Sequence, residues 1–259
     1  MSVWQHGLFL LCVGLATFTQ NLTGFAFGLV LLGLVAQFHL VPLTVAANVV
    51  TVMVLVNAAM VVRRWPRLPS PLPIAILLSS LVGVATGVWL LSLLSDHAMN
   101  ELRVGLGLAI LVCSSLLILK EHRRERISTS ASFALFGWLS GVMGGLFASA
   151  GPPMVFHMYR QPLKREVIQE TLVLLFAVNA VLRLLLVAAH DSFDMPSARL
   201  SLEALPVVLG LTWMARRYPP RWSPASVRRV VFVLLLVAGG CLVVPTLMTL
   251  VRSLQGVFA

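Results

Sequence analysis

Long apolar segments alternate with short polar connections along almost the whole chain of 259 residues. A helix of about 20 apolar residues crosses the ~30 Å hydrocarbon core of a bilayer. The pattern predicts uninterrupted helices at about 41–62, 74–94, 102–119, 167–189, 200–214 and 230–251. We therefore expect an all-α polytopic membrane protein that forms a single membrane domain, residues 1–259.

Two further apolar regions, about 3–38 and 133–159, are interrupted near their middle. The first contains "TQNLTGFAFG" (19–28) and the second "GGLFASAGPP" (144–153). Prolines cannot continue a helix from its N-terminal side but fit the first turn of a new one, so a half-helix should begin near Pro152. Backbone groups freed at such breaks must lie within protein or line a wet cavity.

The two broken regions open two halves of similar layout, about 1–120 and 131–259. Each half has a broken region followed by three helices. An offset of about 122 residues lays "FAFG" over "FASA" and Asn57 over Asn179. This layout predicts an internal repeat, which is common in secondary transporters.

The charges of the connections predict that the two repeats are inverted. Basic residues mark cytoplasmic loops. The connections at about 63–67, 120–126 and 216–229 are basic, whereas those at about 95–101 and 190–195 carry acidic residues. Corresponding connections of the two halves thus have opposite signs.

A simple crossing by the second broken region would place Arg160, Lys164 and Arg165 outside, against this rule. We therefore expect each broken region to be re-entrant and both chain termini to lie outside. Each arm of the first region should have about 16 residues, or roughly 24 Å of helix.

Composition agrees with a membrane protein and argues against other classes. The chain is 59% hydrophobic and 11% charged, with a net charge of +10. A soluble domain would carry about 25% charged residues. Topology accounts for most of the positive charge, so we expect no nucleic-acid partner. The three cysteines are isolated, and no HExxH or GxSxG motif is present, so we expect no metal, no cofactor and no enzyme activity.

Polar residues within the apolar segments are candidates for a substrate site. Half-helix N-termini offer free N–H groups and a positive dipole end, which suits an anion. Arg183 lies deep in an apolar helix, where an arginine is a functional hypothesis by default. The candidate binding residues are Gln20, Asn21, Thr23, Gly24, Asn57, Ser149, Gly151, Pro152, Asn179 and Arg183. Glu170 is the candidate for proton coupling.

Two of these interpretations have alternatives. Asn57 and Asn179 correspond under the repeat and could bind substrate or could form hydrogen bonds between helices. The segment "GVMGG" (141–145) could be a helix-packing face and not part of a site.

The motifs that open the two halves, "QNLTGFAFGLVLLGLVA" and "GVMGGLFASAGPPMVFHMYRQP", resemble those of the sulfite exporter TauE/SafE family, also called the 4-toluene sulfonate uptake permease family. The second motif fits best, with G-x-x-G-G at 141–145 followed by G-P-P at 151–153. The first departs from the family pattern, since it lacks the proline and the run of glycines. The resemblance implies transport of small sulfur-containing anions, such as sulfite or organosulfonates, across the cytoplasmic membrane.

We therefore expect a multi-pass secondary transporter that works by alternating access. Its partners would be a small anionic substrate and the lipid bilayer, and the sequence leaves a homo-oligomer open. The alternatives are a carrier of carboxylates or other organic anions on the same fold, or a membrane-embedded enzyme.

Overall fold

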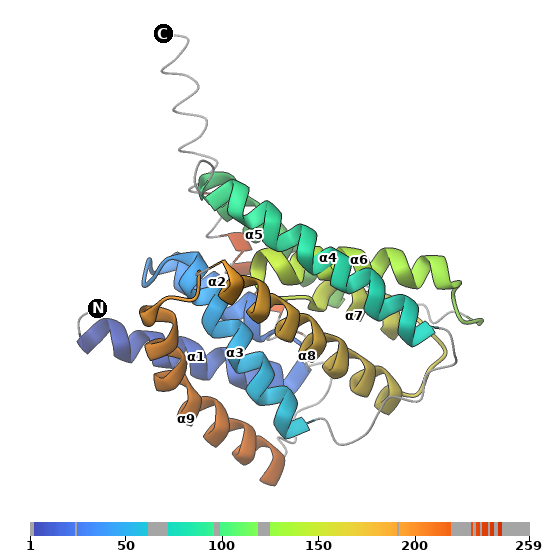
Figure 1. The fold of residues 1–259 in the computed structure, drawn as a ribbon. Coiled ribbons are helices and arrows are strands. Elements are labelled where there is room, and N and C mark those ends of the chain that lie inside the picture. Colours follow the sequence, from blue (N-terminus) through green and yellow to red (C-terminus); the bar gives the residue numbers. More distant parts are fainter. Residues whose placement is uncertain are drawn as a thin grey trace.

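The computed structural model describes residues 3–23, 25–61, 72–95, 99–118, 125–190 and 192–218, with a few positions between 229 and 244. The secondary structure of these residues is helical (Figure 1). The helices are α1 Val3–Thr23, α2 Phe27–Gln37, α3 Leu43–Val61, α4 Leu72–Ser95, α5 Met99–Ile118, α6 Ser130–Phe147, α7 Gly151–Tyr159, α8 Arg165–Ala189 and α9 Met195–Arg217. Most of the helix expected at 230–251 lies outside the described residues.

The polytopic membrane protein expected from the sequence is confirmed. Helices α3, α4, α6, α8 and α9 are long and apolar enough to cross a membrane. Large apolar side chains also cover the outside of the bundle, including Leu78, Trp89 and Leu185, each at least 60% exposed. Such a surface is suited to lipid and not to water.

Both predicted breaks are present. The first separates α1 from α2, and the second separates α6 from α7. At the second break Ala148 adopts a left-handed conformation with φ of 50°. This conformation ends α6, as a residue beyond a helix C-terminus commonly does. Gly151 and the prolines after it then begin α7.

The expected arm lengths of the first break were wrong. Helix α1 has 21 residues and α2 has 11, where arms of about 16 were expected. The threonines before the break are accommodated within the helix, because Thr17 and Thr19 each satisfy their hydroxyl by donating to the carbonyl four residues earlier, at 2.7 Å. Helix α1 is thus about 31 Å long, which is close to the thickness of a bilayer core, but it is not among the helices that are both long and apolar enough to cross one.

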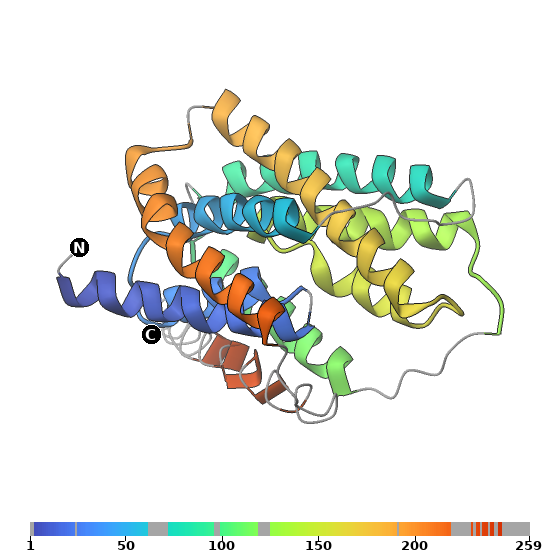
Figure 2. The ribbon, with the colours of Figure 1, turned by 90° about the horizontal axis from the view of Figure 1, so that it is seen from below.

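The second broken region is a hairpin. Gln161, just after α7, accepts a hydrogen bond from the Ser128 backbone N–H at 2.9 Å and donates to the Ser128 hydroxyl at 3.0 Å. Ser128 lies just before α6, so both ends of the region are on the same side of the molecule. Figure 2 shows α7 running back beside α6, and α2 beside α1. This is the course of a re-entrant region, although its placement in a bilayer stays a prediction.

The halves pack on each other through corresponding helices. In the first half α4 packs against α6 and α8, and in the second half α9 packs against α1 and α3. Helices α4 and α9 occupy the same place in the two predicted repeats. The contacts are those that a two-fold relation between the halves would produce, and the inverted repeat itself stays a prediction.

A glycine face joins α4 and α6. A Cβ added at Gly141 would lie 2.1 Å from the Ser80 carbonyl oxygen, and one at Gly83 would lie 2.3 Å from the Trp138 carbonyl oxygen. Gly145 approaches Val84 in the same way, at 2.4 Å. The packing interpretation of "GVMGG" therefore holds for Gly141 and Gly145.

Candidate functional site

The two breaks meet at the centre of the bundle. A Cβ added at Gly28, in the first turn of α2, would lie 3.0 Å from Ser149 Cβ and 3.2 Å from the Ala148 carbonyl oxygen. One added at Gly151 would lie 3.1 Å from the ring of Phe25. Glycine fits at both positions because each of them faces the opposite break at close range, where a larger side chain would have little room.

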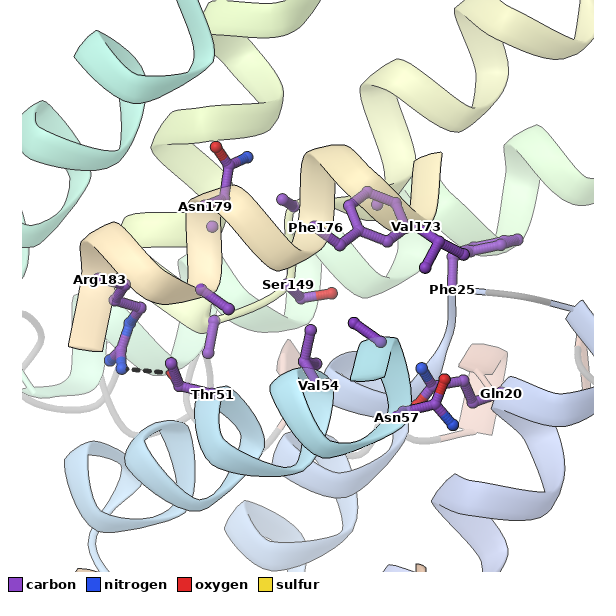
Figure 3. A pocket seen from close by; sticks show the side chains of 17 residues that line it. Gln20, Phe25, Thr51, Val54, Asn57, Ser149, Val173, Phe176, Asn179 and Arg183 are labelled. Carbon is purple, nitrogen blue, oxygen red and sulfur yellow. Dashed lines mark hydrogen bonds between the residues drawn. The ribbon is translucent and has the colours of Figure 1, made fainter. Parts of the chain in front are cut away.

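A cavity lies beside this meeting point, between α3 and α8 (Figure 3). We call it the central cavity. Its lining residues are Gln20, Phe25, Gly28, Thr51, Val54, Asn57, Ala58, Gly144, Ala148, Ser149, Ala150, Gly151, Val173, Phe176, Asn179, Ala180 and Arg183. Of the candidate residues, the structure thus brings together Gln20, Asn57, Ser149, Gly151, Asn179 and Arg183.

One stripe of α3 and one stripe of α8 supply the facing walls. The lining positions in each helix are three residues apart, with one adjacent pair, which places them on one face. They also correspond under the offset of 122 residues found in the sequence. The pairs are Thr51 with Val173, Val54 with Phe176, Asn57 with Asn179, and Ala58 with Ala180. This correspondence supports the predicted repeat.

Arg183 is buried at one end of the cavity, with 2% of its surface exposed. Its Nε donates to the Gly145 carbonyl at 3.2 Å. Its Nη1 donates to Thr51 Oγ1 at 2.7 Å, to Asn48 Oδ1 at 3.2 Å and to the Ala47 carbonyl at 3.4 Å. Among the described residues, Nη2 has no hydrogen-bond partner and no carboxylate pairs with the guanidinium.

Asn48 extends this network away from the cavity. Its Nδ2 donates to the Ser192 carbonyl at 2.9 Å and to Ser197 Oγ at 3.2 Å. The guanidinium is thereby fixed through α3 to the connection between α8 and α9. Sequence reasoning did not single out Thr51, although its three-residue spacing from Asn48 puts both on one face of α3.

The paired asparagines form hydrogen bonds between helices, and both also face the cavity, so their substrate-binding role stays a prediction. Asn57 lines the cavity and donates to Thr212 Oγ1 of α9 at 3.4 Å. Asn179 lines it too and accepts from Ser80 Oγ of α4 at 3.0 Å. Each asparagine therefore joins its own helix to the corresponding helix of the other half while it faces the cavity.

Three candidate residues carry buried polar atoms that have no hydrogen-bond partner among the described residues: Asn21 Nδ2, Ser149 Oγ and Asn179 Nδ2. Leaving such an atom unpaired costs about 1–3 kcal/mol. Amide nitrogens are donors and a hydroxyl can donate, so these atoms call for an acceptor. Ser149 and Asn179 line the central cavity, and Asn21 does not.

The N-termini of the two half-helices at the cavity, α2 and α7, differ in the backbone N–H groups that they can offer to a ligand. Gly28 lies in the first turn of α2, whose N–H groups have no partner within the helix. In α7 the second and third residues are Pro152 and Pro153, which have no N–H. Both helices present a positive end, but α2 retains the hydrogen-bond donors.

The remaining candidates do not join this group. The side chains of Thr23 and Pro152, and the whole of Gly24, lie outside the described residues. Glu170 is exposed and does not line the central cavity, so its coupling role stays a prediction.

Membrane-length helices around a cavity formed where two broken helices meet define the class of secondary membrane transporters. Comparison with known proteins gives the family. The chain belongs to the sulfite exporter TauE/SafE family, whose model matches residues 9–250. It is therefore a multi-pass protein of the cell membrane.

One relative covers almost the whole chain. A protein of Cupriavidus necator described as a probable sulfite/organosulfonate exporter TauE is 32% identical over 236 residues, which are 91% of this chain and 92% of that protein. No solved structure matches the chain.

Proposed function

We propose that the chain is a secondary transporter that carries a small sulfur oxyanion, sulfite or an organosulfonate, by alternating access around the central cavity. The family and the description of the Cupriavidus relative support the substrate class. The observation that carries the proposal is the buried guanidinium of Arg183, which has no acidic partner among the described residues.

A buried charge is tolerated when it is paired and its hydrogen bonds are satisfied. Three of the five N–H groups of Arg183 are used by the protein, and the two on Nη2 are left for a ligand. An anion at this place would supply the missing countercharge. Ser149 Oγ and the α2 N-terminus offer further donors within the same cavity.

Transport then requires no covalent bond to form or break. It requires only that the cavity open first to one side of the membrane and then to the other. The two halves would exchange roles around the paired breaks, as inverted repeats do. Glu170, which is exposed on α8, is our proposed carrier of a coupling proton.

The test compares purified wild-type protein in liposomes with Arg183→Gln. Wild type should take up sulfite or sulfoacetate in preference to acetate. Arg183→Gln should lower this transport roughly 30-fold or more, because a buried charge pair is typically worth 2–5 kcal/mol when one partner is removed. Arg199→Gln is the matched control, since Arg199 is exposed and lies outside the cavity.

Transport of acetate without transport of any sulfur anion would replace the proposal with a carboxylate carrier on the same fold. Equal loss in both arginine variants would remove Arg183 from the binding site.

A further inference from the structure

We propose that the central cavity selects organosulfonates whose tail carries no positive charge, and that it rejects aminosulfonates. The inference rests on the proposed function and narrows its substrate class. It uses the extent of the cavity lining, the chemistry of its far end, and the position of the charged side chain of Arg183.

The residues that line the cavity extend further than the size of an inorganic anion. Arg183 lies at one end and Gln20 and Asn57 at the other, with Ser149 between them (Figure 3). The lining stripe of α8 runs from Val173 to Arg183, ten residues that rise about 15 Å. A sulfonate group bound at Arg183 would therefore direct an attached tail along this lined path.

Away from Arg183 the cavity lining is first apolar and then polar but uncharged. Val54 and Phe176 line the middle, and the amides of Gln20 and Asn57 line the far end. The Gln20 amide has no hydrogen-bond partner among the described residues. Among the described lining residues Arg183 is the one charged side chain, and none is Asp or Glu.

An ammonium group on the tail would lie in a site whose described lining offers no negative charge to pair with it. A desolvated cation needs a paired anion, and a neutral amide does not replace one. The positive ends of α2 and α7, which meet at the cavity, would repel it further. A hydroxyl on the same tail needs only a hydrogen bond, and an amide oxygen provides it.

Two ligands of the same size separate these cases: 2-hydroxyethanesulfonate and 2-aminoethanesulfonate. We expect the hydroxyl compound to bind the detergent-purified protein at least about tenfold more tightly, measured by calorimetry and checked by thermal shift. Binding of the amine as tight as that of the hydroxyl compound would overturn the inference and leave the proposed function standing. Binding of neither compound, nor of sulfite, would instead overturn the proposed function.

Gln20→Glu provides the reverse test, since it adds a carboxylate to the far end with almost no change in shape. The variant should bind 2-aminoethanesulfonate more tightly than wild type does and the hydroxyl compound no better. Gln37→Glu, at an exposed position in the last turn of α2, is the control and should leave both affinities unchanged. If Gln20→Glu does not fold, Asn57→Asp makes the same test, because its carboxylate can accept from Thr212. No gain of amine binding in the folded variant would count against the inference.

Discussion

At the scale of single residues, the site is marked by side chains that the fold leaves incompletely bonded. The Ser149 hydroxyl is buried without a partner in the described part of the chain, whereas Ser114, which is also buried, donates to the Phe232 carbonyl at 3.0 Å. A protein gains no stability from the first arrangement. The unpaired hydroxyl is explained if a ligand completes it.

Replacing each of these two serines with alanine should have opposite effects on stability and on anion affinity. Ser149→Ala should leave the thermal unfolding temperature unchanged or raise it, because an unsatisfied group is removed, while anion affinity falls. Ser114→Ala should cost about 1 kcal/mol of stability and leave anion affinity unchanged. Thermal shift with and without sulfite measures both. A destabilised Ser149→Ala with normal affinity would contradict a ligand role for this hydroxyl.

The sequence could identify the polar residues but not all of their partners. Arg183, Asn57 and Asn179 were predictable because polar side chains are rare in apolar helices. Thr51 was not, because a threonine in such a helix usually bonds to its own backbone, and Thr51 does so at 2.8 Å through Ala47. Its second role, accepting from Arg183, depends on how α3 and α8 face each other.

At the scale of helices, breaks were easier to predict than arm lengths. The prolines at 152–153 restrict the backbone directly, so α7 was expected to start near Pro152, and it starts at Gly151. The end of α1 was harder to place, because threonine and amide side chains are compatible with a helix as well as with a turn. The polar residues of the first motif therefore belong to α1, and the break follows them.

The glycine face between α4 and α6 predicts a sharp dependence on side-chain size. Gly141→Ala should destabilise the protein by about 1–3 kcal/mol, because the new Cβ would collide with backbone atoms that cannot rotate away. Gly210→Ala, in α9, is the control: nothing lies within 4 Å of its added Cβ, and stability should stay the same or rise slightly. The unfolding temperatures of the two variants in detergent give the comparison, and equal values would show that the contact is looser than described.

At the scale of the whole molecule, the hairpin of α6 and α7 decides the topology. Arg126 lies just before this hairpin and Lys164 just after it, and both are exposed. Met195 is 84% exposed at the start of α9, beyond the full length of α8. The first two positions should therefore share one side of the membrane, and the third should lie on the opposite side.

Single cysteines at these three positions, in a background without Cys12, Cys113 and Cys241, test the arrangement with a membrane-impermeant thiol reagent. Arg126→Cys and Lys164→Cys should react from the cytoplasmic side, and Met195→Cys from the outside. Reaction of Lys164→Cys from the outside, with Arg126→Cys protected, would exclude a re-entrant second region.

The glycine face also makes the two corresponding helix contacts between the halves mechanically unequal. Helices α4 and α6 touch through their backbones, but the corresponding α1 and α9 meet through side chains: a Cβ at Gly14 would lie 3.6 Å from Leu211, an ordinary contact, and His6 meets Glu203 at 2.8 Å. Interlocked backbones resist shear, whereas side chains can exchange rotamers as helices slide. During a transport cycle α4 and α6 would therefore travel as one rigid body, and the sliding surface would be the one between α1 and α9.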